Sequence, residues 1–370
     1  MKMLLTLNTG SSSVKFRLFG LSENLPLVAG GKVSSIGEAP VFKAHLENGP
    51  TVTQSLTPSS SHEDAVLTIL EWLKTSISPT YSLTGIAHRI VHGGEYIHSV
   101  RLTPDDMVYL HGLEPLAPLH QPHNLAGVRL LTMHLPGVAH YGCFDTAFHA
   151  GRSELHTTFA LPEKIRSSGI RRYGFHGLSY NWISHTLHHD FPHLREKKVV
   201  AAHLGNGASL CAMHKGRSVD TTMGFTALDG LPMGTRCGAL DPGVVLHLQR
   251  DMNYSASEME QMLYEESGLK GLSGISNDVQ TLLAAGTPRA MFALDYFVHK
   301  VAQNIAAQAV SLGGMDALVL TGGIGENNPD LCKAILEKIA FLPPFETLVI
   351  PANEERWMAL DIYEHFGKDM

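Results

Sequence analysis

The sequence has few cysteines, few charges and no long apolar run, and each scarcity excludes a class of protein. Four cysteines occur among 370 residues, and none belongs to a C-x-x-C pair, which argues against a zinc ribbon or a disulfide-stapled fold. No apolar run approaches the roughly 20 residues of a membrane-spanning helix. The apolar start of the chain ends at Asn8, too early for a signal-peptide core. We therefore expect a cytoplasmic protein with no membrane partner.

Charge is also sparse. Charged residues make up 17% of the chain, hydrophobic residues make up 44%, and the formal net charge is −7. This composition is typical of a folded protein, and the negative balance argues against a nucleic-acid partner. Because domains usually hold about 100–200 residues, the length predicts two of them.

One pattern, a strand, a short Gly/Ser/Asn turn and a second strand, occurs twice about half a chain apart. The first copy spans residues 4–19 with its turn at 9–13, and the second spans 199–213 with its turn at 205–209. The repetition indicates an internal duplication. It predicts two related α/β halves with a cleft between them.

Apolar periodicity predicts further elements. Residues 62–73 have helical spacing, residues 85–91 and 317–320 are expected to be strands, and a glycine-rich turn is expected at 321–327. The remaining expectations are a helix start at Asn328 and Pro329, a strand at 348–350 and a closing helix from Glu354.

Three glycine-rich turns follow apolar strands, at residues 9–13, 205–209 and 321–327. Such turns expose backbone N–H groups that can surround a phosphate. A single turn of this kind is commonplace, but three favour nucleotide phosphate binding. The Walker and protein-kinase signatures are both missing.

A few charged residues stand in apolar or glycine-containing segments. Lys15, just after the first turn, either reaches a phosphate or faces outward as a strand lysine. Arginine is seldom buried without a partner, so Arg89 and Arg236 are expected to face an anion that they bind in bidentate fashion. Asp145 is a lone carboxylate among apolar residues, where a strand-end cap is the alternative.

The chain has 22 histidines, so each is a weak candidate by itself. His176 is the best of them, because small and cationic residues surround it. The histidines at 185, 188, 189 and 193 favour a polar helix face over a metal site, since no H-E-x-x-H sequence accompanies them.

Several motifs resemble those of the acetate kinases. Residues 171–179 (RRYGFHGLS) are similar to a signature of that family, and residues 7–16 (LNTGSSSVKF) are similar to its N-terminal motif. The other matches, in the order expected for the family and across almost the whole chain, lie at residues 88–95, 117–120, 144–149, 203–207, 233–236, 321–327 and 351–355.

The resemblance implies two duplicated actin-like, ribonuclease H-like α/β domains with a nucleotide cleft between them, in a homodimer. Residues 1–148, closed by a helix at 355–370, would form the acyl and phosphate side, and residues 149–354 the nucleotide-binding domain. The implied reaction is the reversible, direct in-line transfer of the ATP γ-phosphoryl group to acetate, giving acetyl phosphate and ADP. It implies Mg²⁺, with Mn²⁺ as the open alternative.

The resemblance also assigns roles residue by residue. Asn8 and Glu354 would lie at the metal site, and Arg89 would bind the acyl group. Our candidates for the acyl pocket are Val91, Leu119, Phe175 and Ala227. The catalytic set would be Arg89, Asp145, His176 and Arg236. The nucleotide contacts would be Lys15, His203, Leu204, Gly205, Asn206, Gly207, Asp278, Val279, Gln280, Gly323, Ile324, Gly325, Glu326 and Asn327.

The chemistry agrees with this assignment. A carboxylate with a pKa of roughly 4–5 is ionised at pH 7 and needs no general base. Catalysis then reduces to aligning two anions and neutralising charge on the phosphoryl oxygens. Asp145 is therefore expected to orient Arg89, Arg236 or metal-bound water rather than to remove a proton.

The sequence departs from the family pattern at several places. Ala239 replaces a usual aspartate, Gln280 a usual arginine and Ala227 a usual proline, and the segment 328–353 is shorter. Gln280 predicts weaker discrimination between nucleotide bases. A propionate or butyrate kinase and a non-metabolic ATP-binding module on the same fold remain alternatives. The retained Arg89, His176 and Arg236 argue against the module, which would have no need of them.

Overall fold

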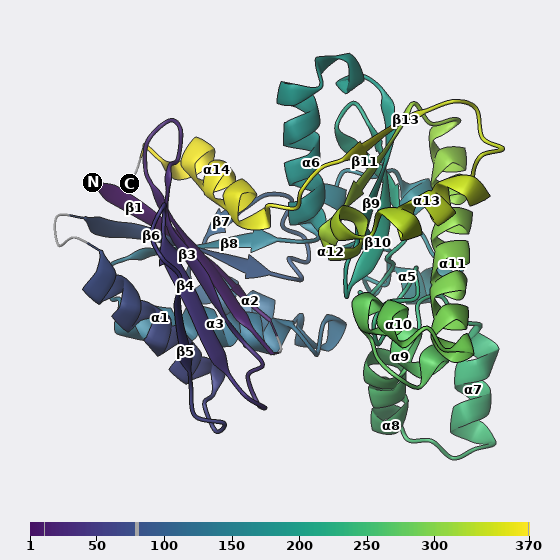
Figure 1. The fold of residues 1–370 in the computed structure, drawn as a ribbon, viewed down its shortest axis with the longest axis horizontal. Helices are drawn as coiled ribbons and strands as arrows, with labels where there is room; N and C mark the ends of the chain where they lie inside the picture. The colour runs from purple at the N-terminus through teal and green to yellow at the C-terminus, as the bar shows by residue number, and fades with distance from the viewer. Residues whose placement is uncertain (11, 78–80, 369) are drawn as a thin grey trace. The chain divides into compact units, whose positions relative to one another are not determined.

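The computed structural model describes residues 1–10, 12–77, 81–368 and 370, which form two compact units (Figure 1). The first unit is Met1–Phe148 with Asn353–Met370, and the second is His149–Ala352. The chain re-enters the first unit at Asn353, so Glu354, which the sequence analysis placed in the second domain, lies in the first. Ser11, within the expected turn at 9–13, lies outside the described residues.

An eight-stranded sheet with the order β5-β4-β3-β2-β1-β6-β8-β7 forms the first unit. Its first two strands make the expected antiparallel hairpin, whereas β1, β6 and β8 run parallel to one another. The strands are β1 Lys2–Thr9, β2 Val14–Gly20, β3 Leu27–Ser34, β4 Val41–Leu46, β5 Val52–Ser55, β6 Ser82–Ile90, β7 Val100–Arg101 and β8 Ala139–Phe144.

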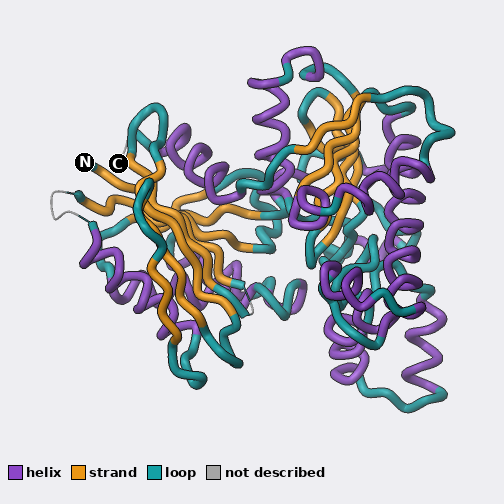
Figure 2. Tube along the Cα trace, viewed as in Figure 1, coloured by secondary structure: helices purple, strands orange, loops and turns teal. Residues whose placement is uncertain are grey.

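Helices cover both faces of this sheet (Figures 1 and 2). On one face, Leu5, Leu7 and Ile86 pack in one apolar cluster with Val66 of α1 and Leu131 of α3. On the other face, α14 packs against β1, β2 and β6. The helices are α1 His62–Ser76, α2 Pro104–His111, the 3-10 turn η1 Glu114–Leu116, α3 Gln121–His134, α14 Glu354–Phe366, and the 3-10 turn η2 Ala147–His149 at the boundary between units.

The second unit repeats this design with a five-stranded sheet, β11-β10-β9-β12-β13. Its β9–β10 hairpin is antiparallel, and β9, β12 and β13 are parallel. This order matches β3-β2-β1-β6-β8, which confirms the predicted duplication. The strands are β9 Lys198–Leu204, β10 Ala208–His214, β11 Arg217–Thr221, β12 Ala317–Thr321 and β13 Glu346–Val349.

Most of the helices belong to the second unit, and none in the described part of the chain combines the length and apolarity needed to cross a membrane. They are α4 Glu154–Thr157, α5 Glu163–Arg166, α6 Gly177–Asp190, the 3-10 turn η3 Pro192–Leu194, α7 Pro242–Arg250, α8 Ala256–Gln261, the π-helical turn η4 Met262–Glu266, α9 Gly268–Ser273, α10 Val279–Ala285, α11 Pro288–Leu312, α12 Gly322–Asn327 and α13 Pro329–Lys338.

The glycine-rich turn predicted at 321–327 is wrong, because this segment forms the short helix α12. Gly322 has a φ of +81°, and a Cβ there would lie 2.7 Å from the carbonyl oxygen of Leu204. Only glycine fits this sharp bend between β12 and the helix. The Gly322 N–H then donates to the Glu326 carboxylate one turn later, at 2.9 Å.

Removing a core side chain from the first sheet tests the packing of this unit. Ile86 is fully buried, so Ile86→Ala should lower the free energy of unfolding by about 2–5 kcal/mol, measured by urea titration. Val108 is 73% exposed, so the matched control Val108→Ala should change it by less than about 0.5 kcal/mol. Equal effects of the two substitutions would contradict the described core.

Candidate active site

In the first unit, β6 carries Arg89 to the face of the sheet that holds α14. Side chains alternate along a strand, and Ile86 faces the cluster under α1 and α3, so Arg89 faces the other way. The Arg89 Nε donates to Asp145 Oδ1 at 3.1 Å, and Nη2 donates to Oδ2 at 2.6 Å. Asp145 is 1% exposed and lies just after the parallel neighbour β8. The structure thus pairs Asp145 with one of the three partners proposed for it.

This ion pair keeps the Arg89 guanidinium in its charged form. Burial by itself would lower the pKa of Arg89, but Asp145, Glu354 and Glu355 together raise that pKa above its ordinary value. Two of the five N–H groups of the guanidinium point to Asp145, which leaves three for a substrate anion. The pair therefore holds an oriented, charged hydrogen-bond donor.

Asn8 and Lys15 lie on the same face of the sheet as Arg89. They stand directly opposite each other in the β1–β2 hairpin, and Leu7 faces the core on the other side. Arg17, two residues after Lys15, donates to the Asn353 side chain at 2.7 Å, just before α14. Lys15 is exposed, which leaves both of its proposed orientations open.

The metal candidates supply oxygen atoms only. Glu354 is the first residue of α14, and Asn8 is half-buried at the end of β1. Among the residues that the structure describes, no group of three or more His, Cys, Asp or Glu side chains forms a metal site. A protein-only cage is therefore missing from the described part of the chain, including the helix face with His185, His188 and His189.

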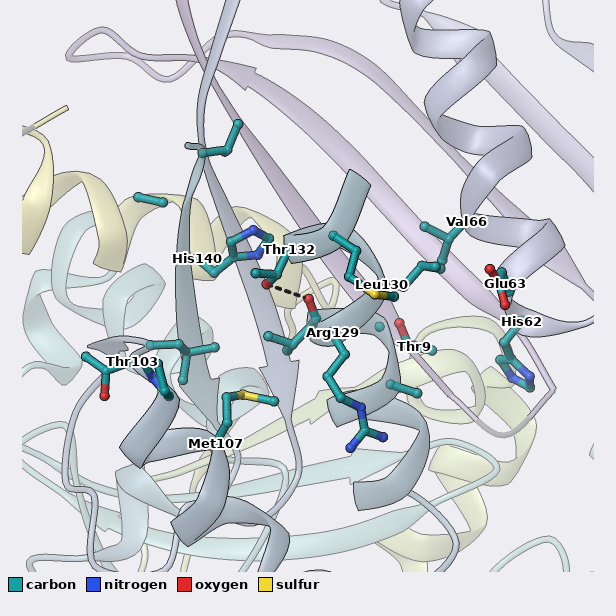
Figure 3. Close-up of a pocket in the computed structure, with 18 of the residues that line it drawn as sticks. Thr9, His62, Glu63, Val66, Thr103, Met107, Arg129, Leu130, Thr132 and His140 are labelled. Atoms are coloured by element: carbon teal, nitrogen blue, oxygen red, sulfur yellow. Dashed lines mark hydrogen bonds between the residues drawn. The ribbon is translucent and has the colours of Figure 1, made fainter. Parts of the chain in front are cut away.

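Figure 3 shows a cavity of about 640 Å³ on the opposite face of the first sheet, beside α3. Thr9, Met107, Arg129 and His140 are among its lining residues, whereas Arg89 is not. The His140 Nδ1 forms a hydrogen bond with His88 Nε2 at 2.9 Å, and burial lowers the pKa of His140 to about 4. The imidazole of His140 in the wall of this cavity is therefore uncharged near neutral pH, and the cavity is separate from Arg89.

In the second unit, His176 and Arg236 converge on one small space beside Gly207. A Cβ at Gly207 would lie 3.0 Å from Arg236 Nη2 and 3.2 Å from His176 Nε2. The absence of a side chain at position 207 therefore lets both side chains approach the backbone closely and converge on the same point. His176 has a left-handed backbone (φ 59°, ψ 22°) at the start of α6, a strained conformation that is common at functional sites.

Two of the predicted phosphate-binding segments lie side by side in this unit. A Cβ at Gly205 would lie 4.0 Å from the Gly323 nitrogen, which brings the β9–β10 turn next to the start of α12. Gly323 and Asn327 are exposed there. The segments could therefore present backbone N–H groups to a nucleotide phosphate.

Other nucleotide candidates have structural contacts of their own. The Asp278 carboxylate caps α10 by accepting from the Thr281 N–H at 2.8 Å. The Glu326 carboxylate accepts from the Gly322 and Ala352 N–H groups, both at 2.9 Å. Leu204, Val279 and Ile324 lie in the core, between 0% and 8% exposed, and Gly325 is buried as well.

Polar contacts hold three more of the predicted residues. The Gln280 amide donates to Asn328 Oδ1 at 2.7 Å. Asn206 Oδ1 accepts from the Asn277 amide at 3.2 Å. His203 Nδ1 forms a 2.9 Å hydrogen bond with the Ser179 hydroxyl.

The four acyl-pocket candidates divide between the units. Val91 and Leu119 belong to the first unit, where Val91 is buried and Leu119 is half-buried. Phe175 is only 1% exposed, so it lies in the core of the second unit. Ala227 is half-buried, and its carbonyl oxygen accepts from Arg236 Nη1 at 2.7 Å. Ala227 therefore helps to place Arg236.

Two buried basic residues that the sequence analysis did not assign hold the loop before α6. His149 forms hydrogen bonds with the Phe175 carbonyl at 2.9 Å and with the Ser218 hydroxyl at 2.8 Å. Burial and the nearby charge of Arg152 lower the pKa of His149 to about 3, so its imidazole is neutral.

Arg152 binds backbone carbonyls, and its Nη1 also lies 4.0 Å from Asp220 Oδ1 in an ion pair. It donates from Nη2 to the carbonyl oxygens of Arg172 and Tyr173, at 2.6 and 2.7 Å. Burial lowers its pKa to about 10. Arginine is seldom buried without a partner. The reasoning that singled out Arg89 could therefore also have found Arg152, which follows the 144–149 motif.

The two sheets, which share five strands in the same order, place this protein in the actin-like, ribonuclease H-like α/β class. A model of the Acetokinase family matches residues 3–348, and the chain belongs to that family. It is therefore a phosphotransferase with a carboxyl acceptor, of a family that uses ATP and a divalent metal.

Named relatives cover nearly the whole chain. The acetate kinase of Rhodopseudomonas palustris strain TIE-1 is 45% identical over 346 residues, which is 92% of this chain and 87% of that protein. The crystal structure of Porphyromonas gingivalis acetate kinase has a TM-score of 0.84 at 32% identity, over 98% of each chain. A propionate kinase from Francisella tularensis subsp. tularensis SCHU S4 has a TM-score of 0.90 at 32% identity, over 98% of this chain and 99% of its own.

The neutral His149 predicts loss of stability in acid. Its pKa is about 3 in the folded protein, below the ordinary 6.5, so the unfolded state takes up a proton first as the pH falls. The contribution of the neutral His149 to the free energy of unfolding is complete above pH 6.5 and is lost as the pH falls toward 3. The slope of the free energy of unfolding against pH should approach about 1.4 kcal/mol per pH unit from this residue.

The measurement is urea unfolding between pH 7 and 4.5. His149→Gln should flatten the slope by about that amount, whereas the exposed control His134→Gln should leave it unchanged. An equal slope in the wild type and in His149→Gln would contradict the described environment.

Proposed function

We propose that this protein catalyses the reversible, Mg²⁺-dependent transfer of the ATP γ-phosphoryl group to acetate, giving acetyl phosphate and ADP. The observation that carries the proposal is the convergence of His176 Nε2 and Arg236 Nη2 beside the bare backbone of Gly207. Two donors aimed at one small space suit the equatorial oxygens of a phosphoryl group in transfer.

The chemical step needs little from the protein except placement. An acetate oxygen attacks the γ-phosphorus, the bond from that phosphorus to the bridging oxygen breaks, and ADP leaves with the electron pair. Acetate is already ionised near neutral pH, so no group has to remove a proton. Arg236 and His176 then stabilise the charge on the phosphoryl oxygens.

Arg89 is proposed to bind the carboxylate of the acceptor. Its bidentate pairing with Asp145 prevents the guanidinium from rotating, so its remaining N–H groups keep one direction. Arginine presents a planar fork that matches a carboxylate, which a lysine at this position would not. Asp145 is thus proposed as the anchor of Arg89 rather than as a base.

The residues at the metal position fit Mg²⁺. Glu354 offers a carboxylate and Asn8 an amide oxygen, both hard donors of the kind Mg²⁺ prefers. Mg²⁺ is commonly held by one or two protein groups together with substrate phosphates, in keeping with the small donor set described here. When bound, the metal would offset negative charge on the ATP phosphates.

The nucleotide is proposed to use the backbone of the turn at Gly205 and of the start of α12 at Gly323. The Gln280 amide, held by Asn328, would present a smaller planar surface to the base than an arginine. The homodimer, the cytoplasmic location and the weak base discrimination expected from the sequence stay predictions.

Replacing Arg89 tests the proposed acceptor site. Arg89→Ala should lower kcat/KM for acetate by about 10²–10³, because a charge-assisted contact to the reacting groups is lost. The assay traps acetyl phosphate as a hydroxamate in the presence of ATP. The matched control is Arg101→Ala, an exposed arginine of the same unit, which should keep full activity. Normal kcat/KM in folded Arg89→Ala would contradict the proposed role of Arg89 in binding the acceptor carboxylate.

The choice between acetate and propionate depends on the acyl pocket. A propionate kinase is among the similar structures, and Ala227 stands where the family usually has proline. An added methylene in an apolar pocket is worth roughly 1–3 kcal/mol. We expect acetate to be the better substrate in the wild type, with substantial turnover of propionate.

The experiment compares kcat/KM for acetate, propionate and butyrate in the wild type and in Ala227→Pro. The proline should reduce kcat/KM for propionate relative to acetate by about tenfold or more. An unchanged ratio would show that Ala227 does not line the pocket, and no turnover of any of the three acids would refute the proposed function.

A further inference from the structure

A hydrogen-bonded chain of three side chains ends at His176, and we propose that Tyr180 and Ser209 hold this histidine as its neutral Nε2–H tautomer. His176 would then donate a hydrogen bond to the phosphoryl group without adding a charge. This inference rests on the proposed function, which gives His176 its role in phosphoryl transfer. It makes Ser209 and Tyr180 positioning residues.

The three side chains come from adjoining elements. His176 begins α6, and Tyr180 lies one turn later, where its N–H donates to the His176 carbonyl at 3.1 Å. Ser209 projects from β10. Its Oγ lies 2.5 Å from the Tyr180 hydroxyl oxygen and 2.8 Å from His176 Nδ1. Ser209 and Tyr180 are both fully buried.

The proposed chain of hydrogen bonds begins at the tyrosine. Burial raises the pKa of Tyr180 well above its usual range, so the phenol keeps its proton. Either hydroxyl can donate in the contact between Tyr180 and Ser209, and in the proposed chain the phenol donates to Ser209 Oγ. The serine hydroxyl then has its own hydrogen to donate, and His176 Nδ1 accepts it. With Nδ1 acting as acceptor, the proton of the neutral ring is on Nε2.

The Nε2 atom is the one that faces the proposed phosphoryl position, beside Gly207. With the phenol donating to Ser209 Oγ, the opposite tautomer would direct a second proton at the same oxygen and would remove His176 Nδ1 as the acceptor of the serine hydrogen. It would also turn an Nε2 lone pair toward an anion, which is unfavourable, so the proposed chain selects the donor form of Nε2.

The charged and titratable groups around His176 also favour a neutral ring. Arg236 shares the space beside Gly207, and a second cation there would be repelled. The ring of His203, on β9, lies 4.4 Å away, and its Nδ1 bonds to Ser179 at 2.9 Å. His149, next to Tyr180, is itself kept neutral by burial.

A neutral donor and an imidazolium predict different pH profiles. An imidazolium would lose its charge as the pH rises through the ordinary pKa of histidine, and kcat would fall. A neutral Nε2–H keeps donating, so kcat should be flat from pH 7 to 9. His176→Gln, whose amide can donate without charge, should retain at least tenfold more activity than His176→Ala.

The direct test is the ¹⁵N NMR spectrum of the imidazole, with the signal of His176 assigned by its loss in His176→Gln. We expect a protonated Nε2 and an acceptor Nδ1 at pH 7.5. Ser209→Ala should change the Nδ1 shift and lower kcat roughly three- to tenfold, the effect of about one hydrogen bond, with KM for acetate unchanged. Tyr180→Phe keeps the ring in the core and should give a smaller change in the same direction.

Ser184→Ala is the matched control, because Ser184 lies on α6 and bonds to the Gly216 carbonyl instead. It should alter neither the spectrum nor kcat. A proton on Nδ1, a doubly protonated ring at pH 7.5, or unchanged Nδ1 shifts in both Ser209→Ala and Tyr180→Phe would overturn the inference. Full activity of His176→Ala together with the expected spectrum would instead overturn the catalytic role of His176 and leave the hydrogen-bonded chain standing.

Discussion

Parallel pairing of the central strands is the constraint on which the rest of this structure depends. In both units a hairpin strand pairs in parallel with a strand that comes much later in the sequence, β1 with β6 and β9 with β12. The carboxyl ends of parallel strands lie at one edge of a sheet, so residues distant in sequence meet there. Arg89 and Asp145 meet at this edge of the first sheet, and the turn at Gly205 meets the start of α12 at that of the second.

The loops at these edges are held by buried polar side chains whose hydrogen bonds are directed at backbone. Arg152 binds two carbonyl oxygens of the segment before α6, and His149 binds the carbonyl of Phe175. Glu326 does the same for two N–H groups around α12. A buried polar group without a partner is costly, so each of these contacts fixes one conformation of its loop. The strained backbone of His176 persists because its surroundings leave it no other arrangement.

Sequence reasoning found the elements whose signal is local. The hairpins, the strands β6, β12 and β13 and the starts of α13 and α14 follow from apolar runs and helix-start residues, and the duplication follows from the repeated hairpin. The strand β8 and the parallel pairing were not predicted. Sequence reasoning did not find the helix α12, because the bend at Gly322 depends on a tertiary contact with the Leu204 carbonyl. Arg89 and Asp145 were each singled out by type, but nothing in the sequence makes one the partner of the other. Tyr180 carried no signal, since a tyrosine in a helix is ordinary. Ser209 was predicted only as the end of the turn at 205–209, whereas it lies in β10, which begins at Ala208.

The nature of the acceptor explains why these few groups suffice. A hydroxyl acceptor would require a base to remove its proton, whereas a carboxylate arrives already charged and as a weak nucleophile. The main barrier is then the electrostatic repulsion between two anions. Fixed positive charges reduce this repulsion, and no mobile proton is needed nearby. The described residues satisfy this demand in two ways: Arg89 remains cationic because Asp145 and Glu354 support it, and the imidazole of His149, next to Tyr180, is kept neutral by burial. A site of this kind achieves selectivity through the shape and charge of its anion pockets, so small changes at their walls alter the preferred acid and leave the reaction itself intact.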